Sequence, residues 1–157
     1  MKVEFIKPEE LEIITQVADL EANIFSDPWS AREVESTVNQ KAALCAVAKK
    51  EEQVLGYFLC YYVLDECEIA RIAVDKNVRR SGVGNELFQF LIEACQEKGI
   101  TRILLDVRAG NEGAIAFYLK NGFAKDGIRK GYYGGANPED AVLMSMDVPS
   151  FSYGSEK

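Results

Sequence analysis

A glycine-containing turn at residues 79–84 is the first candidate for chemistry in this 157-residue sequence. It reads RRSGVG and directly precedes an apolar-periodic segment, so it lies where a helix is expected to begin. The first N–H groups of a helix have no partner within it, and the helix dipole makes that end partially positive. Glycines let the backbone approach a ligand, and Arg79 and Arg80 add positive charge. The turn predicts a phosphate or pyrophosphate site, although a plain strand-to-helix turn explains the glycines equally well.

Two familiar nucleotide-binding motifs are incomplete at this turn. The phosphate-binding loop of many nucleotide hydrolases needs a lysine after its last glycine, and asparagine follows Gly84. The dinucleotide fingerprint needs a third glycine or small residue where Leu87 stands. The turn therefore belongs to neither class of nucleotide-binding site.

A carboxylate inside an apolar run is the second candidate. The segment TRILLDVRA, residues 101–109, is typical of a strand covered on both faces, and strand alternation puts Asp106 beside Leu104 and Arg108. A charged side chain is rarely buried in such a run unless it is paired or functional. An internal ion pair with Arg71 or Arg108 is the structural explanation, and proton transfer is the functional one.

Composition excludes several kinds of chemistry. The sequence has no histidine, which excludes serine–histidine and cysteine–histidine triads and most zinc enzymes, so we expect no metal. A net charge of −7 argues against direct binding to nucleic acid or to an anionic membrane, and it suits a cationic partner such as an amine. The four cysteines form no C-x-x-C pair and are expected to be buried and reduced: Cys45, Cys60, Cys67 and Cys95.

The first residues, MKVEFIKPEE, lack the long apolar core of a secretory signal. No stretch of the sequence approaches the length of an apolar membrane span. We therefore expect a cytoplasmic protein.

The elements that must position these residues follow an α/β pattern. Apolar periodicity and capping signals predict helices at about residues 8–25, 30–38, 83–98 and 111–121. Apolar runs bounded by turns predict strands at residues 42–50, 54–65, 67–75, 101–109, 123–133 and 140–148. The unit from the third strand through the glycine turn and its helix to the fourth strand is a crossover. We expect one domain over residues 1–148, a mixed sheet flanked by helices, and a flexible tail at 149–157.

Several separate segments carry a family resemblance. The GNAT superfamily of acetyl-CoA-dependent N-acetyltransferases has motifs similar, in the same order, to ARIAVDKNVRRSGVGNELF, LLDVRAGNEGAIAFYLKNGF and GYYGGANPEDAVLM. Within it, the sequence most resembles the RimI-type ribosomal-protein-alanine acetyltransferases, which have an aromatic-Pro-Trp-Ser segment similar to FSDPWS. The resemblance covers residues 5–148. It implies the GNAT fold, in which two splayed strands of the sheet form the acetyl-CoA cleft.

The resemblance implies that the expected anion is the pyrophosphate of acetyl-CoA, the acetyl donor. The family signature Q/R-x-x-G-x-G/A corresponds to residues 79–84. A splayed strand would offer unpaired backbone groups to the amide-rich pantetheine arm. The cofactor contacts implied in this way fall on Ile72, Ala73, Val74, Arg79, Arg80, Ser81, Gly82, Val83, Gly84, Asn85 and Asn111.

The resemblance also implies a general base and a general acid. RimI-type enzymes use a glutamate in the strand as base and a tyrosine in the following helix as acid, and these positions correspond to Asp106 and Tyr118. Asp106 is one methylene shorter than the family glutamate, so a bridging water is expected, and Glu68 on the neighbouring strand is the alternative base. Tyr118 is expected to hydrogen-bond the departing sulfur, although helical spacing alone is more typical of a core aromatic.

Two loops are implied at the acceptor end of the cleft. Trp29 follows Pro28 in the first loop, and Tyr132 and Tyr133 lie in the second, KGYYGGANPEDA. Such rigid aromatics could grip the first residues of a peptide. The carboxylates of Glu139 and Asp140 could attract its amino terminus. The structural alternative is an exposed connection with two anchoring aromatics.

Residues and resemblance together predict an enzyme that acetylates the N-terminal α-amine of a protein by direct attack in a ternary complex. By resemblance, the acceptor is the N-terminal alanine of a small-subunit ribosomal protein. Cys95 lies on an apolar helical stripe, so a cysteine relay is not expected. Three alternatives remain: a relaxed acetyltransferase for lysine side chains or small amines, a non-catalytic acetyl-CoA-binding module, and a nucleotide-binding regulator.

Overall fold

The structure is a computed structural model that describes residues 1–150. The flexible tail expected at residues 149–157 therefore falls almost entirely outside the described residues. Its first residue, Pro149, accepts a hydrogen bond of 2.8 Å through its carbonyl from Gln96 Nε2. None of the helices within residues 1–150 is both long enough and apolar enough to cross a membrane.

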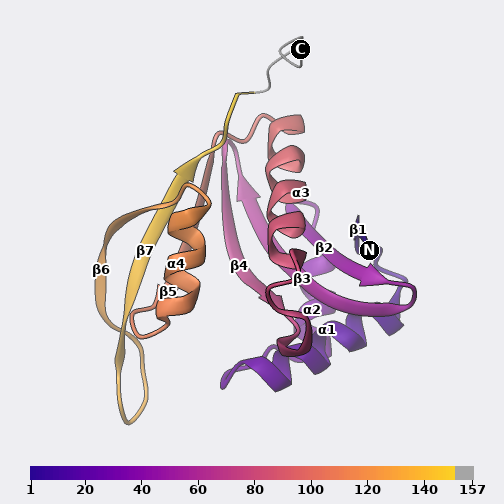
Figure 1. The fold of residues 1–157 in the computed structure, drawn as a ribbon, viewed down its shortest axis with the longest axis horizontal. Coiled ribbons are helices and arrows are strands. Elements are labelled where there is room, and N and C mark those ends of the chain that lie inside the picture. Colours follow the sequence, from indigo (N-terminus) through magenta and orange to yellow (C-terminus); the bar gives the residue numbers. More distant parts are fainter. Residues whose placement is uncertain (151–157) are drawn as a thin grey trace.

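A mixed sheet forms the centre of the molecule, as predicted, and it has seven strands where six were expected (Figure 1). Its spatial order is β1-β2-β3-β4-β5-β7-β6, with β4 and β5 parallel and every other neighbouring pair antiparallel. The strands are β1 (Lys2–Phe5), β2 (Ala43–Lys50), β3 (Gln53–Val63), β4 (Glu66–Val74), β5 (Arg102–Arg108), β6 (Ala124–Tyr133) and β7 (Glu139–Asp147). The parallel pair follows from the predicted crossover, because a helix joins β4 to β5.

Helices cover both faces of the sheet. The four α-helices are α1 (Leu11–Ile24), α2 (Ala31–Val38), α3 (Val83–Glu97) and α4 (Glu112–Lys120), and a short 3-10 turn, η1 (Lys76–Val78), precedes α3. The larger apolar cluster joins α3 and α4 to one face, and the smaller one joins α1 and α2 to the other. The two faces therefore have different cores, and β2 and β3 contribute side chains to both.

The parallel pair β4–β5 is paired over only part of its length. Backbone partners run from Glu66↔Arg102 to Ile69↔Leu105, and beyond this point the two strands diverge. A bulge in β4 lies at the same place, because Leu59 of β3 pairs with Arg71 while Cys60 pairs with Ile69. The divergence is the splayed strand pair that the resemblance implied.

Local capping signals in the sequence are confirmed at two helices. Ser30 and Glu33 form a reciprocal capping box at α2, with side-chain-to-backbone distances of 3.2 and 2.9 Å. The Oδ1 atom of Asn111 accepts a hydrogen bond from the N–H of Ala114 at the start of α4. The second cap fixes the side chain of Asn111 beside the diverging strands β4 and β5, where it lines the cavity described below.

Three expectations about the elements are wrong. Strand β1 was not predicted, although the alternation in KVEF is a strand pattern, and it forms the edge beside β2. Helix α1 begins at Leu11 rather than Pro8, and Leu11 itself is 57 % exposed at the helix end. Strand β5 is buried on one face only, since Leu104 and Asp106 are half-buried. The sheet face that carries Asp106 has no covering helix opposite β5–β7 within residues 1–150.

Candidate active site

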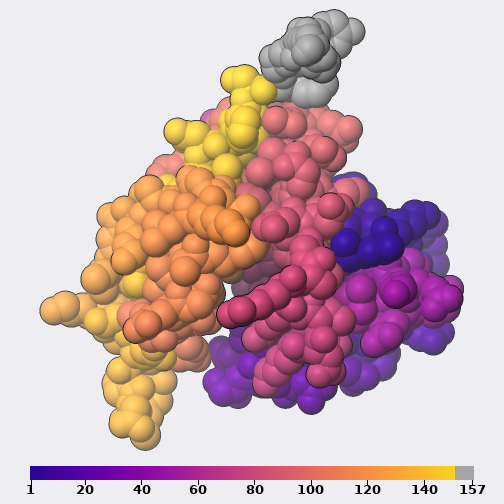
Figure 2. All heavy atoms as spheres, viewed as in Figure 1, coloured from indigo at the N-terminus to yellow at the C-terminus, as the bar shows by residue number. Residues whose placement is uncertain are grey.

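A cavity of about 700 Å³ opens where β4 and β5 diverge. Figure 2 shows the surface hollowed between α4 and the beginning of α3. Most residues singled out from the sequence line this cavity: Ile72, Ala73, Val74, Arg79, Arg80, Gly82, Val83, Gly84, Asn85, Asp106, Asn111, Tyr118 and Tyr133. Six of the candidate site residues do not line it: Trp29, Glu68, Ser81, Tyr132, Glu139 and Asp140.

The head of α3 forms one wall of the cavity. Gly82 is the N-cap residue and adopts φ +89°, a left-handed conformation that strains any residue with a β-carbon. Gly84 has a different reason to be glycine, because a β-carbon there would lie 3.3 Å from Phe117 Cε1. Gly82 thus turns the chain into the helix, and Gly84 lets α3 approach α4 closely. The free N–H groups of the first helical turn are left beside the cavity.

The polar side chains before α3 behave differently from one another. Arg79 donates through Nε to the carbonyl of Val74 at 3.2 Å, so part of its guanidinium holds the end of β4. Arg80 is exposed and has φ +68°. The hydroxyl of Ser81 donates to the carbonyl of Val78. The two arginines thus bring positive charge to the helix head, whereas Ser81 stabilises the turn.

The end of β4 provides an unpaired backbone edge. Ile72, Ala73 and Val74 pair with β3 on one side. On the other side the pairing with β5 has already stopped at Ile69. Backbone N–H and C=O groups at this edge can therefore bond a ligand rather than a strand.

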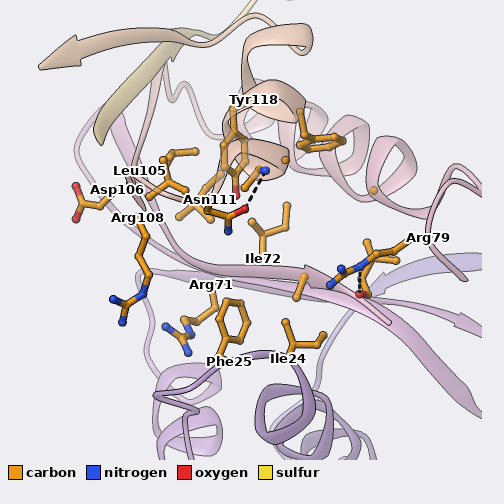
Figure 3. A pocket seen from close by; sticks show the side chains of 18 of the residues that line it. Ile24, Phe25, Arg71, Ile72, Arg79, Leu105, Asp106, Arg108, Asn111 and Tyr118 are labelled. Carbon is orange, nitrogen blue, oxygen red and sulfur yellow. Dashed lines mark hydrogen bonds between the residues drawn. The ribbon is translucent and has the colours of Figure 1, made fainter. Parts of the chain in front are cut away.

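Tyr118, on α4, projects into the cavity (Figure 3). Its side chain is only 8 % exposed, and no hydrogen bond to its hydroxyl occurs within residues 1–150. Burial raises the pKa of Tyr118, with further contributions from Cys60 and Tyr133. The hydroxyl is therefore protonated at neutral pH and free to donate a hydrogen bond to an incoming group.

Asp106 faces the other way. Leu105 packs in the α3–α4 core, so alternation directs Asp106 to the opposite face, and Figure 3 shows its carboxylate pointing away from Tyr118. The ion pair considered for it, with Arg71 or Arg108, does not form, because both arginines bind other carboxylates. Glu68 is exposed on β4 and lies outside the cavity.

A fully buried carboxylate holds the connection between α1 and α2 in place. Glu21 of α1 is 0 % exposed and accepts from Arg71 Nη2 at 2.7 Å and from the Tyr57 hydroxyl at 2.6 Å. Its Oε1 atom also accepts from the backbone N–H of Trp29 at 2.9 Å. The guanidinium of Arg71 lies 4.3 Å from the centre of the Phe25 ring and 5.6 Å from that of Trp29. The cluster fixes the α1–α2 connection against β4.

A second cluster surrounds Arg108 at the end of β5. Its Nη1 atom lies 3.3 Å from Glu139 Oε1, and its Nη2 atom lies 3.6 Å from Asp27 Oδ2. The guanidinium carbon lies 4.2 Å from the centre of the Tyr133 ring. Burial raises the pKa of Tyr133, and the nearby negative charge of Asp106 raises it further. Asp106, Arg108 and Tyr133 therefore lie together at the end of β5 and line the same cavity.

The two remaining aromatics expected at the acceptor end contact their neighbours outside the cavity. Trp29 packs against the smaller core and beside Arg71. Tyr132 packs edge-on against Tyr133, with ring centres 5.1 Å apart, and carries Arg129 on its face. Their proposed contacts with an acceptor would have to be made at the rim.

Sequence reasoning missed two acidic residues at the site. Glu21 falls on the buried stripe of α1 with Ile14 and Val17, and an acid at that spacing on an apolar face is a signal that could have found it. Asp27 lines the cavity near the ends of β4 and β5, and no pattern in the sequence around it indicates this position.

None of the four cysteines lines this cavity. All four cysteines are free and buried, as predicted. Within the described part of the chain, no three His, Cys, Asp or Glu side chains gather in a way that could hold a metal ion.

Comparisons with known proteins agree with this geometry. The model of the acetyltransferase (GNAT) family matches residues 14–123. A Bacillus subtilis (strain 168) protein provisionally named a ribosomal protein bS18-alanine N-acetyltransferase is 34% identical over 139 residues, 88% of this chain and 91% of its own.

Solved structures extend the comparison to the fold. The crystal structure of the ribosomal-protein-S18-alanine N-acetyltransferase from Escherichia coli superposes with a TM-score of 0.84 at 27% identity, covering 98% of this chain and 96% of its own. An aminoglycoside 6'-N-acetyltransferase complexed with coenzyme A shares the fold, with a TM-score of 0.83 at 17% identity over 98% of this chain and 100% of its own. The chain therefore belongs to the acetyltransferase (GNAT) family, and it is an acetyltransferase.

Proposed function

We propose that the protein transfers the acetyl group of acetyl-CoA to the N-terminal alanine of ribosomal protein bS18. The observation that carries the proposal is the cavity at the β4–β5 splay, with a helix N-terminus at one side and the Tyr118 hydroxyl inside it. The choice of acceptor is supported by the relatives from B. subtilis and E. coli, whose names specify that alanine.

The donor fits the residues present. The amide groups at the head of α3, with Arg80, suit the pyrophosphate of acetyl-CoA. The unpaired edge of β4 at Ile72, Ala73 and Val74 suits the amides of the pantetheine arm. The Oδ1 atom of Asn111 caps α4, so its side-chain N–H groups remain available to hydrogen-bond acetyl-CoA.

The chemistry requires an uncharged acceptor nitrogen. At pH 7, removing the proton costs about 1.1 kcal/mol for an α-amine but about 4.6 kcal/mol for a lysine side chain. Asp106 lies half-buried on the acceptor face and forms no ion pair within residues 1–150, so it can take that proton through a water. The nitrogen then attacks the thioester carbon, the carbon–sulfur bond breaks, and Tyr118 stabilises the departing sulfur through its hydroxyl. An acetyl-CoA-to-amine transfer of this kind needs no covalent enzyme intermediate, and the buried Cys95 is not positioned to form one.

The test uses acetyl-CoA and pairs of short peptides that share one sequence with an internal lysine. One peptide of each pair has a free N-terminal alanine, and in the other that amine is blocked. We expect mass spectrometry to find the acetyl group on the α-amine of the first and none on the second. Labelling of the lysine in both peptides would overturn the proposed acceptor, and it would support a relaxed amine acetyltransferase.

A further inference from the structure

Asp27, in the connection between α1 and α2, lines the cavity and has no role in the chemistry above. We propose that its carboxylate binds the protonated amino terminus of the acceptor as the acceptor enters the cleft. This inference rests on the α-amine acceptor proposed above, and it assigns the residue that recognises that amine.

Two arginines hold Asp27 across the open end of the splay. Arg71, on β4, donates to the backbone carbonyl of Asp27 at 3.0 Å, and its Nη2 atom lies 3.7 Å from Asp27 Oδ1. Arg108, on β5, has its Nη2 atom 3.6 Å from Asp27 Oδ2. Both carboxylate distances exceed hydrogen-bond length. The charge of Asp27 is therefore fixed in place while its oxygens keep their capacity to accept hydrogen bonds, and its side chain is 56 % exposed.

Each of these arginines already has a closer acidic partner. Arg71 Nη2 lies 2.7 Å from Glu21 Oε1, and Arg108 Nη1 lies 3.3 Å from Glu139 Oε1. Within each pair, the carboxylate neutralises the charge of its arginine. Among the three carboxylates that lie beside these arginines, Asp27 is the one without a charged partner at hydrogen-bond distance, and an ammonium group with three N–H donors complements it.

The carboxylates expected from the sequence to attract the acceptor have other partners. Glu139 accepts from the backbone N–H of Gly110 at 2.9 Å as well as from Arg108. Asp140 accepts from the backbone N–H of Gly131 at 2.9 Å. Both side chains hold the β6–β7 loop and the end of β5 together. We therefore assign recognition of the acceptor's amino terminus to Asp27 rather than to Glu139 or Asp140.

Asp27 and Asp106 would act at different stages. A carboxylate bonded to an ammonium group keeps the proton on nitrogen, so Asp27 favours binding of the charged acceptor rather than its deprotonation. Asp106 lies two residues before Arg108 on the same face of β5 and is left to accept the proton. Asp27 should therefore affect the affinity for the acceptor and leave the affinity for acetyl-CoA unchanged.

The test measures binding of two peptides to the protein saturated with coenzyme A, by calorimetry at pH 6.5. One peptide begins with alanine, and its partner carries a propionyl cap, which is alanine without the ammonium group. We expect the wild-type protein to prefer the amino peptide by roughly tenfold or more, the range of a charge-assisted hydrogen bond. Asp27→Asn should bind both peptides equally, and Asp27→Glu should recover part of the preference.

The control is Asp19→Asn, which removes the same charge from an exposed position on α1 outside the cavity and should keep the full preference. Circular dichroism checks that each variant is folded. If Asp27→Asn keeps the wild-type preference while α-amines are still acetylated, this inference is wrong and the proposed function stands. If the wild-type protein acetylates no α-amine, the proposed function and this inference are both wrong.

Discussion

Asp106 and Tyr118 lie on opposite faces of the sheet at the splay between β4 and β5. Tyr118 enters the cavity from the α4 side, whereas Asp106 faces the side of the α1–α2 connection. The attacking amine and the leaving sulfur are two different substituents of the tetrahedral carbon that forms during acyl transfer, so the groups that serve them can approach from different directions. The arrangement therefore suits proton removal on one face and stabilisation of the leaving group on the other.

Replacing Asp106 by alanine should reduce kcat by roughly 100-fold or more, the usual contribution of a general base. The dissociation constant for acetyl-CoA should not change, because the side chain points away from Tyr118 and the donor side. Steady-state kinetics and calorimetry measure the two effects. Asp147→Asn, which removes a carboxylate at the far end of β7, is the matched control. Unchanged turnover would move the base elsewhere, and Glu68→Gln is the next variant to test.

Replacing Tyr118 by phenylalanine should lower kcat by about 10- to 100-fold while leaving the free energy of unfolding nearly constant. The reason is that its hydroxyl has no hydrogen-bond partner in residues 1–150, so folding loses no contact. Because burial raises the pKa of Tyr118, the wild-type kcat should also show no loss from tyrosine ionisation up to about pH 10. A variant with wild-type kcat would leave Tyr118 as a core aromatic only.

Replacing Gly82 by alanine should weaken acetyl-CoA binding by roughly tenfold. At φ +89° a β-carbon strains the backbone by about 1–2 kcal/mol, and relief of that strain would reorient the N–H groups at the head of α3. Gly99→Ala is a matched control, since Gly99 has φ +74° and no atom near its missing β-carbon but lies at the other end of the helix. Both variants should lose similar stability, and only the first should lose affinity.

Replacing Glu21 by alanine should lower the free energy of unfolding by about 3 kcal/mol, because it leaves the Arg71 guanidinium largely buried without its carboxylate. The Tyr57 hydroxyl and the Trp29 N–H lose their acceptor in the same variant. Denaturant unfolding measures the effect. Glu12→Ala, in the exposed first turn of α1, should stay within about 0.5 kcal/mol of wild type. A similar loss in both variants would contradict a structural role specific to Glu21.

Much of the fold could be predicted because its signals are local. The capping box at Ser30 and Glu33 involves residues three apart, and the Asn111 cap works in the same way. The crossover from β4 to β5 follows from the need of parallel strands for a long connection. These features depend on neighbours in the sequence, so the sequence alone indicates them.

The partners of the charged residues could not be predicted, because they depend on contacts between distant segments. Simple alternation would put Arg71 on the same face as Ile69, but the bulge in β4 turns it to the α1 face. There it meets Glu21, which lies 50 positions earlier. A pattern of period two carries no information about a bulge, and the pairing of Arg71 with Asp106 was therefore a reasonable but wrong alternative.

Alkaline pH should destabilise the fold through its buried thiols. Burial raises the pKa of Cys45 to about 11, and the pKa values of Cys60, Cys67 and Cys95 are also raised, the last two chiefly by hydrogen bonds between thiols. A raised pKa in the folded state means that stability is complete below the ordinary thiol pKa, about 8.5, and is lost as pH rises through the folded value.

Between pH 8.5 and 10 the unfolded chain therefore releases protons that the folded protein keeps. The free energy of unfolding should fall by up to about 1.4 kcal/mol per pH unit for each such thiol. Urea unfolding from pH 7 to pH 10 measures the slope. Cys45→Ala should be less stable at pH 7 because it leaves a small cavity, but its stability should decline less steeply above pH 8.5. A parallel decline in the variant and the wild type would show that Cys45 does not contribute, since its titration would then be the same in both states.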